Sequence, residues 1–409
     1  EKATKLKDLA IFPMIRNLTM NFELTEEQLM LQESAKRLGE NFGLEYWREI
    51  DSAKQYPSEI WRAICEAGFC GVAIPEKYGG SGLGMVELAI AIEALCAAGG
   101  GSTLSQIFML NPIFGGISLS RFASSEMRQE LLPPLIAGKI TFAMGLTEPD
   151  AGTNTLAMRS FAREDGDGWL LNGQKIWITA VPQASKMLVV ARTKKLEDVD
   201  RKTDGISLFM IDADREGLTH SAIKKTGTNT LPSSSVFFDE VRIEPSEIIG
   251  EVHDGFGPLL DVLNTERIVT SSGLVGTTQL AIDIAVKYAS NRKIFGGKPT
   301  GSYQSIQFPL AEAKIELECA KLMNFKAASL YDDGKPYGSE ANMAKFLSGK
   351  AAASATDRAM QTLGGMGYAK ESDVERLWRD ARLFRIAPVS EEMVLNYVAQ
   401  HDLGMPRSY

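Results

Sequence analysis

Histidine and cysteine are scarce in this chain of 409 residues, which contains three histidines and four cysteines. The histidines are scattered, and the cysteines (Cys65, Cys70, Cys96 and Cys319) form neither a CxxC pair nor a regular framework. A zinc site or a disulfide scaffold needs such clustering, so the sequence predicts no bound metal. The chain is therefore expected to be reduced and intracellular.

An excess of positive charge is also missing. The chain has 44 Lys and Arg against 52 Asp and Glu, a formal net charge of −8. A broad nucleic-acid surface needs a basic patch, so nucleic acid is not expected as a partner. No uninterrupted apolar run approaches the roughly 20 residues that cross a bilayer, so no membrane span is expected.

The first residues mix charges of both signs and have no signal-peptide core. Met20 then precedes a pattern typical of a capped helix, so residues 1–19 are predicted to be an extension outside the main fold. With no evident transit peptide, the bacterial cytoplasm is favoured, and the mitochondrial matrix is the alternative for a eukaryotic chain.

The length predicts two or three domains. Residues 20–137 follow a helical rhythm, and Thr25 is placed to cap the first helix. Residues 138–253 contain short β-branched and aromatic runs between turn residues, typical of hairpins or a small barrel. Residues 254–409 return to long helical patterns. Helical, β and helical segments in this order predict an α+β fold.

The segment NTERIVT (264–270) places a carboxylate beside a guanidinium near the start of a long amphipathic helix. From the helical pattern alone, Glu266 is either a solvated surface charge, half of a structural ion pair, or a catalytic base. Glu266 and Arg267 lie about 100° apart around a helix and need not pair with each other.

Five motifs follow one another along the chain: AMGLTEPDAGTN (143–154), NGQKIWITA (172–180), NRKIFG (291–296), MQTLGGMGY (360–368) and RLWRDAR (376–382). Together they resemble the acyl-CoA dehydrogenase family over essentially the whole chain. The resemblance implies FAD and three domains: an N-terminal helical domain, a central β-barrel-like domain and a C-terminal four-helix bundle. It also implies a homotetramer, with a dimer as the alternative.

The activity implied by the resemblance is α,β-dehydrogenation of an acyl-CoA thioester to the trans-2-enoyl-CoA, as in fatty acid metabolism. A carboxylate removes the α-proton while hydride leaves the β-carbon for flavin N5. Electron-transfer flavoprotein is the implied electron acceptor. Such a base needs desolvation to raise its pKa, because the α-proton is very weakly acidic.

The resemblance also assigns contacts to particular residues. The FAD contacts are Met144, Leu146, Thr147, Thr153, Trp177, Ile178, Thr179, Arg292, Phe295, Gln304, Gln361, Gly364, Gly365, Ser390 and Glu392. The substrate contacts are Thr153, Asn264 and Arg267. Arg292 and Phe295 belong to a motif that, in the family, reaches the FAD of a neighbouring subunit.

Read as residues alone, these positions have ordinary alternatives. The loop LTEPDAGT offers hydroxyls and amides to a flavin edge, but it also fits a plain β-turn. Trp177 and Thr179 share one strand face, where a tryptophan more commonly packs into a core. Arg292 fits a solvated surface charge, and LGGMG (363–367) fits a helix C-cap.

Two segments depart from the family pattern. The loop FGGKPTGSYQ (295–304) is one glycine longer than usual, which leaves the role of Gln304 open. In many members the base lies in a C-terminal Ile-Tyr-Glu-Gly-Thr-like segment, where this chain has Pro388. Proline can be neither a base nor an N–H donor to the thioester carbonyl.

A minority of the family, including isovaleryl- and long-chain-type enzymes, places the glutamate on a helix directly before an arginine. Glu266 and Arg267 match that arrangement, so Glu266 is the predicted base. Two rival functions stay open: a flavoenzyme of this fold with oxygen or elimination chemistry, and a catalytically idle assembly subunit. The acyl chain is not readable from the sequence.

Overall fold

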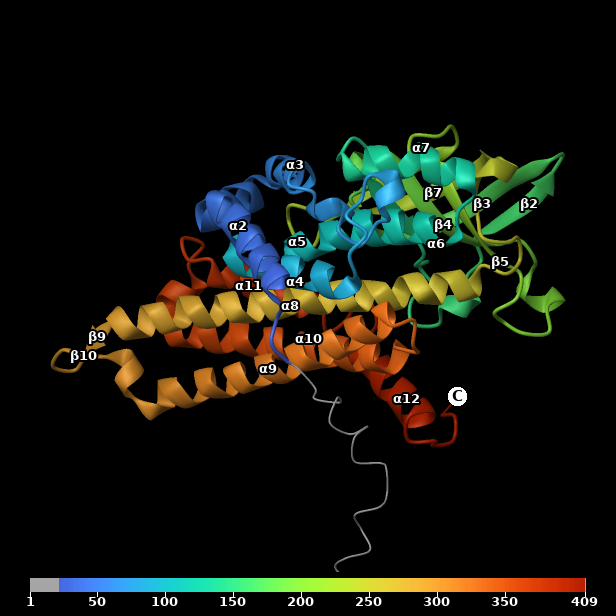
Figure 1. The fold of residues 1–409 in the computed structure, drawn as a ribbon. Helices are drawn as coiled ribbons and strands as arrows, with labels where there is room; N and C mark the ends of the chain where they lie inside the picture. Colours follow the sequence, from blue (N-terminus) through green and yellow to red (C-terminus); the bar gives the residue numbers. More distant parts are fainter. Residues whose placement is uncertain (1–21, 409) are drawn as a thin grey trace, which may run out of the picture.

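The computed structural model describes residues 22–408, so the predicted extension at residues 1–19 lies outside the described residues. Helices come first, then strands, then helices, which confirms the predicted α+β organisation (Figure 1). The helices of the first segment are α2 (Glu26–Ala53), α3 (Ser58–Glu66), α4 (Met85–Leu95), α5 (Gly101–Phe108), α6 (Ser118–Phe122) and α7 (Ser125–Ile136).

The start of α2 follows directly from its sequence. Thr25 is the N-cap: its hydroxyl accepts from the backbone N–H of Gln28 (3.2 Å), and the Gln28 side chain accepts from the N–H of Thr25 (3.1 Å). This reciprocal capping box satisfies two N–H groups that a helix start leaves without partners. The predicted cap at Thr25 is confirmed.

Between α4 and α6 the chain stays helical through two π-helical segments, η3 (Cys96–Gly100) and η4 (Met109–Ile117). The continuous stretch Met85–Phe122 and helix α8 (Phe256–Asn291) are both long and apolar enough to cross a membrane by length and composition. However, 72% and 83% of their most apolar windows are buried inside the protein. Core helices of this burial need no bilayer to cover them.

The middle segment forms one eight-stranded sheet. The strands are β1 (Phe142–Gly145), β2 (Phe161–Asp165), β3 (Gly168–Thr179), β4 (Lys186–Arg192), β5 (Ile206–Asp212), β6 (Leu218–Ile223), β7 (Ser233–Ile243) and β8 (Ile248–Ile249). Their order is β6-β7-β3-β2-β4-β5-β8, and β1 pairs in parallel with β4. A hydrophobic core of its own covers one face of the sheet, with Leu171, Val189, Phe209 and Val241 all fully buried.

The last segment is built on α8, α9 (Gln304–Asp332) and α10 (Gly338–Leu363), with α11 (Val374–Leu383) and α12 (Glu391–His401) against them. Helix α8 packs closely on α4 of the first segment at Gly276. A Cβ added to this glycine would lie only 2.5 Å from the carbonyl of Glu93. A small hairpin of β9 (Lys293–Ile294) and β10 (Lys298–Pro299) lies at the end of the molecule opposite the sheet (Figure 1).

Candidate functional site

Glu266 lies on α8 and is buried, with only 5% of its surface exposed. Its carboxylate forms no hydrogen bond or ion pair with any residue between 22 and 408, although a buried charge normally has such a partner. Burial therefore raises the pKa of Glu266 from 4.5 to about 7, against the opposing positive charges of Arg267 and Lys345. Such a group is close to half-ionised at neutral pH, as a general base should be.

The neighbouring Arg267 acts on Glu266 as a positive charge but forms no ion pair with it. Its guanidinium donates to the side-chain oxygen of Asn264, one helical turn earlier. Burial lowers the pKa of Arg267, and its Nε has no hydrogen-bond partner among the described residues. The structure thus brings together the three residues predicted on this helix, and it leaves one buried donor of Arg267 open for a ligand.

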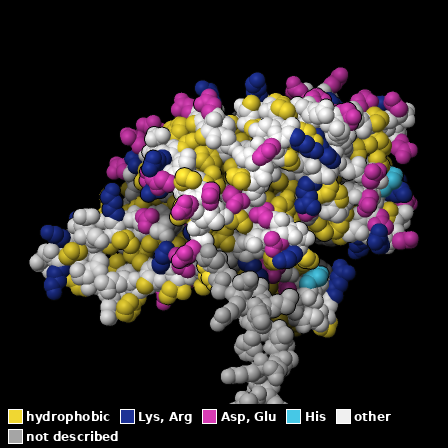
Figure 2. Space-filling model, in the orientation of Figure 1, with side chains coloured by type: hydrophobic (Ala, Val, Ile, Leu, Met, Phe, Trp, Pro, Cys, Tyr) yellow, Lys and Arg dark blue, Asp and Glu magenta, His cyan; other side chains and the backbone are white. Residues whose placement is uncertain are grey.

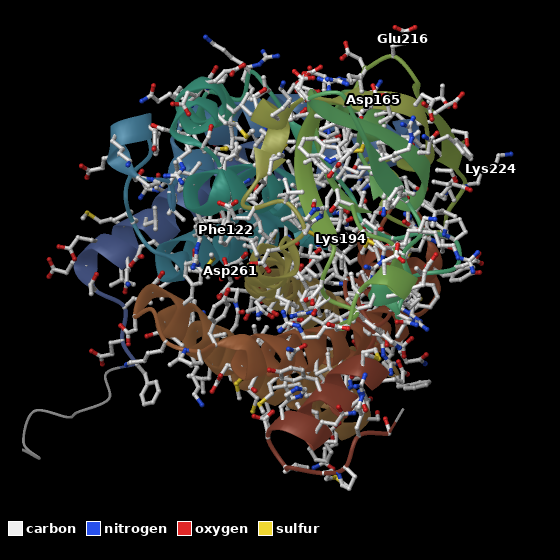
Figure 3. All side chains as sticks on the ribbon, turned by 90° about the vertical axis from the view of Figure 1, so that its right-hand side faces the viewer. Phe122, Asp165, Lys194, Glu216, Lys224 and Asp261 are labelled. Atoms are coloured by element: carbon white, nitrogen blue, oxygen red, sulfur yellow. The ribbon has the colours of Figure 1, made fainter. Side chains whose placement is uncertain are left out.

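Polar side chains continue from these residues toward the start of α8. Asp261 forms an ion pair with Arg121 (3.0 Å) and accepts from the hydroxyl of Tyr337 (3.0 Å). The guanidinium of Arg121 also lies over the ring of Phe122 at the end of α6, and Figure 3 labels Phe122 and Asp261 as seen from the side of the sheet. The sequence patterns did not single out this cluster, because its members come from three separate segments.

The loop before α12 is connected to the site through Lys345, which also acts on Glu266 as a positive charge. Lys345 of α10 is fully buried, and its Nζ donates to the carbonyl of Val389, next to Pro388. Ser390 caps α12 by accepting from the N–H of Met393 (3.3 Å). Glu392, the other predicted cofactor contact here, lies exposed in the first turn of α12.

On the sheet side, a buried ion pair fixes the predicted cofactor loop. Lys175 donates to Glu148 (2.8 Å) and to the carbonyl of Leu146 (2.9 Å), while the N–H of Ile176 donates to the carbonyl of Thr147 (2.8 Å). Sequence reasoning missed the pair of Lys175 and Glu148. Both residues stood within quoted motifs, but nothing in the patterns showed that two charges so far apart in sequence would be buried together.

Trp177 has the geometry expected of a ligand contact rather than a core residue. It is 55% exposed and has a φ of +64°, at a register irregularity between β3 and β7. A non-glycine residue with positive φ is uncommon and often occurs at a functional site. Ile178 is buried and Thr179 half-buried, so the alternation predicted for this strand holds.

The flavin ring requires a flat apolar surface and hydrogen-bonding groups at its polar edge. Trp177 offers the surface, and the hydroxyls of Thr147, Thr153 and Thr179 have no hydrogen-bond partner among residues 22–408. The donor set on this face therefore fits such a ring. Met144 is 7% and Ile178 2% exposed, so little of either side chain is available to a ligand.

The other predicted FAD contacts lie at the far end of the molecule. Arg292 follows α8 directly, and 26 residues of helix at about 1.5 Å each place it roughly 39 Å from Glu266. Phe295 is 88% exposed in the adjacent hairpin, and Gln304 begins α9. Within one chain, these residues cannot reach the ligand that Glu266 reaches.

The end of α10 is similarly open. Gly364, with a φ of +61°, is the C-cap of the helix, as the cap interpretation predicts. A Cβ added to Gly364 or Gly365 would meet no atom within 4 Å, and Gln361 is exposed. No described residue comes close enough to these two glycines to require the absence of a side chain. Among the described residues, no group of three or more His, Cys, Asp or Glu could hold a metal ion.

Comparison with known proteins agrees with this architecture. Three family descriptions match in order: the acyl-CoA dehydrogenase N-terminal domain (residues 25–139), middle domain (143–241) and C-terminal domain (253–403). Acyl-CoA dehydrogenase FadE12 of Mycobacterium tuberculosis is 37% identical over 391 residues, covering 95% of this chain and 99% of the relative. The chain therefore belongs to the acyl-CoA dehydrogenase family, a family of oxidoreductases.

Solved structures show the same relationship. The glutaryl-CoA dehydrogenase–glutaryl-CoA complex has a TM-score of 0.90 and 31% identity, covering 95% of this chain and 98% of that one. The FAD complex of PigA has a TM-score of 0.88 and 29% identity, covering 94% and 99%. FAD is the cofactor that membership of the family implies, and the face around Trp177 fits it.

Proposed function

We propose that this protein is an FAD-dependent acyl-CoA dehydrogenase in which Glu266 removes the α-proton of an acyl-CoA thioester. The observation that carries the proposal is the environment of Glu266. It is a buried carboxylate without a hydrogen bond or ion pair among the described residues, and its pKa is raised to about 7. Pro388 removes the alternative base of the C-terminal loop.

We assign each step of the reaction to particular residues of this site. The proton of the α-carbon passes to a carboxylate oxygen of Glu266, and the β-hydrogen leaves with two electrons, so that a trans double bond forms. FAD, when bound, supplies the acceptor for these two electrons. Trp177, Thr147 and Thr179 would hold its ring, while Asn264 and the open Nε of Arg267 would bind the substrate.

The thioester carbonyl needs a donor, because negative charge develops on its oxygen as the α-proton leaves. Pro388 has no N–H, but the N–H of Val389 makes no hydrogen bond with the described residues and is the next one along the chain. We therefore assign to the N–H of Val389 the hydrogen bond to the thioester carbonyl. Losing one such donor typically costs about 3 kcal/mol of transition-state stabilisation, so a replacement is needed.

Assembly into a homo-oligomer forms part of the proposal. Phe308, Ile315 and Leu322 are exposed at intervals of seven residues along α9. Figure 2 shows hydrophobic side chains gathered over the end of the molecule where α9 lies. A second copy on this stripe would cover it, and would allow Arg292 and Phe295 to serve a neighbouring FAD. A tetramer, or a dimer, fits this need.

The remaining assignments come from the family. We propose electron-transfer flavoprotein as the acceptor that reoxidises FAD, and fatty acid metabolism as the setting. One structurally similar chain, with a TM-score of 0.89 and 30% identity, was solved in work on the electron transferring flavoprotein of Acidaminococcus fermentans. That relationship supports the proposed acceptor.

The test is an anaerobic titration of the purified protein with a panel of short, long and branched acyl-CoAs. Bleaching of the flavin absorbance by one class would identify the substrate. The variant Glu266→Gln should bind the same acyl-CoA, seen as a shift of the flavin spectrum, but bleach about 100- to 10,000-fold more slowly.

Three results would contradict the proposal, in whole or in part. If no acyl-CoA bleaches the flavin but a reductant makes the protein consume oxygen, the fold supports oxygen chemistry instead. If the purified protein is colourless and takes up no FAD, an assembly role is favoured. A Glu266→Gln variant that bleaches at the wild-type rate would remove Glu266 from the mechanism while leaving the substrate assignment intact.

A further inference from the structure

Lys345 is a lysine with no exposed surface in the middle of α10. Lysine is almost never fully buried unless it is paired, yet Lys345 forms no ion pair with the described carboxylates. Within residues 22–408, the only hydrogen bond of its side chain runs from Nζ to the carbonyl of Val389. Burial lowers its pKa to about 8, although the nearby Glu391 opposes this effect. The fold therefore retains a costly buried ammonium group for a single carbonyl contact.

The charges around Lys345 come from three helices. Glu266 and Arg267 of α8 and Glu391 and Glu392 of α12 all act on it electrostatically. Glu391 has the strongest effect of these charges, but it accepts two hydrogen bonds from Arg385, both 2.7 Å, and forms no ion pair with Lys345. Glu266 has no such competitor among the described residues.

The other elements that pack against α8 include α6 and α9, whose Arg121 and Lys321 form ion pairs with Asp261 (3.0 Å) and Glu93 (2.5 Å). Helix α5 has the sequence GSTLSQIF and η4 has MLNPIFGGI, and neither contains an ionisable side chain. Tyr337 and Tyr397 act on Arg267 rather than on Glu266. Lys345 and Arg267 are therefore the two positive charges that act on Glu266, and only Lys345 also reaches the loop before α12.

We propose that Lys345 is a positioning residue for the dehydrogenation. Its ammonium group fixes the loop around Pro388 and Val389 through the carbonyl of Val389, and it acts as a positive charge on the carboxylate of Glu266. The inference rests on the proposed function, with Glu266 as the base.

Both effects serve the same reaction. Because Lys345 holds the carbonyl of Val389, it also fixes the N–H of Val389, which we assign to the thioester carbonyl. Because Lys345 acts on Glu266 as a positive charge, it favours the ionised form that can accept a proton. A purely structural contact would need no charge, since an apolar side chain of similar volume is usually cheaper to bury than an ammonium group.

The test compares three variants: Lys345→Met, which removes the charge, Lys345→Arg, which keeps it, and Lys350→Met, a matched control at an exposed lysine of the same helix. The readout is the pH dependence of kcat/KM for the acyl-CoA that bleaches the flavin. In Lys345→Met the acidic limb should move up by about one pH unit, the lower end of the effect of a close charge. At pH 6, kcat/KM should therefore fall about tenfold beyond any loss at pH 9.

Lys345→Arg should keep the limb at the wild-type pH, even if its larger side chain lowers the rate at every pH. Lys350→Met should match the wild type throughout. Flavin content and melting temperature report folding, and Lys345→Gln replaces the Met variant if the latter does not retain FAD. Because Glu266 and Lys345 titrate close together, the limb belongs to the coupled pair.

An unmoved limb in a folded, FAD-loaded Lys345→Met or Lys345→Gln variant would overturn the inference. So would an equal shift in Lys345→Arg, because the charge would then not be the cause. Failure of the proposed function looks different, since Glu266→Gln would then keep the wild-type rate. If Glu266→Gln is slow but the acidic limb does not move in the Lys345 variants, only the role of Lys345 is contradicted.

Discussion

Two glutamates of this protein are equally buried but lie in opposite environments. Glu148, 6% exposed, accepts from Lys175 (2.8 Å) and from the backbone N–H groups of Arg159 (2.6 Å) and Ser160 (2.9 Å). Glu266, 5% exposed, accepts from no described residue. Burial acts to raise the pKa of both, but at Glu148 the charge and hydrogen bonds of Lys175 prevail and the pKa is lowered.

The difference separates a structural carboxylate from a reactive one. A carboxylate whose lone pairs are occupied stays ionised and holds its neighbours in place. A buried carboxylate without such partners keeps its proton-accepting capacity for a ligand. Glu148 thus organises the loop that would hold the flavin ring, whereas Glu266 is available for the reaction. Substitutions at the two sites should therefore change the free energy of unfolding by different amounts, and the contributions of the two carboxylates to it should depend on pH in opposite directions.

The largest effect on stability is expected from Lys175→Met. It leaves Glu148 buried and uncompensated, which should lower the free energy of unfolding by about 3–5 kcal/mol. Flavin content should fall as well, since Leu146 and Thr147 lose their anchor. Denaturant unfolding measures the first effect. The double variant Lys175→Met/Glu148→Gln should recover part of the loss, and no recovery would mean that the two side chains are not coupled.

Glu266→Gln, in contrast to Lys175→Met, should raise the free energy of unfolding, and the gain should depend on pH. Because the folded pKa of Glu266 is raised from 4.5 to about 7, wild-type stability is lost as pH rises through this window. The neutral glutamine avoids that loss, so the variant should gain about 3 kcal/mol relative to wild type between pH 4 and pH 8. Melting curves across this range would show it. A relative loss instead would mean that Glu266 is held in an ion pair.

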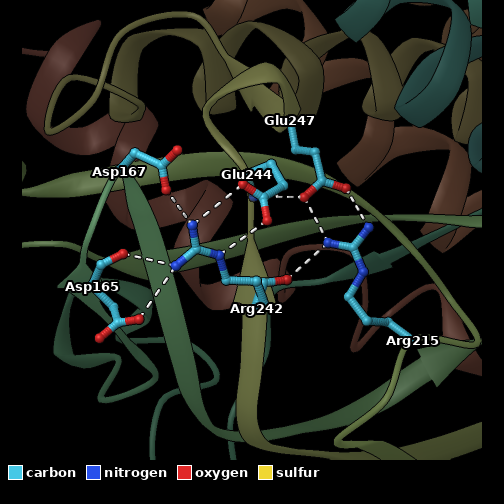
Figure 4. Close-up of polar contacts among 6 residues, drawn as sticks. All are labelled: Asp165, Asp167, Arg215, Arg242, Glu244 and Glu247. Atoms are coloured by element: carbon cyan, nitrogen blue, oxygen red, sulfur yellow. Dashed lines mark hydrogen bonds and ion pairs between the residues drawn. The ribbon is translucent and has the colours of Figure 1, made fainter.

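The smallest effects are expected in the charge network near the ends of strands β2 and β7 (Figure 4). Arg215 donates twice to Glu247 (2.6 and 2.5 Å), which is only 13% exposed. Glu247→Gln should cost about 1 kcal/mol of unfolding free energy. Asp167, 84% exposed, pairs with Arg242, and Asp167→Asn should leave the melting temperature unchanged in high salt. Equal losses of unfolding free energy in Glu247→Gln and Asp167→Asn would contradict the expectation that the more buried ion pair contributes more.

Much of the fold was predictable because it rests on local patterns. The cap at Thr25, the C-cap at Gly364 and the alternation around Ile178 depend on residues within one turn or one strand. The family resemblance added the placement of Glu266 before Arg267, together with the recognition that Pro388 cannot be a base.

The polar contacts beneath the site were not predictable in the same way. Lys175 with Glu148 and Lys345 with Val389 join segments far apart in the chain, and no periodicity reveals which lysines are buried. The positive φ of Trp177 also escaped the strand pattern, because it arises where the register between β3 and β7 shifts. Such features depend on tertiary contacts rather than on local preference.

The most direct measurement of the central claim is the pH dependence of flavin reduction in a single turnover of the wild-type protein. If the carboxylate of Glu266 takes the α-proton, the rate should rise with pH through an apparent pKa near 7, and this limb should vanish in a uniformly slow Glu266→Gln variant. A limb near 4.5, the ordinary value for a glutamate, or a limb that persists in Glu266→Gln, would contradict it.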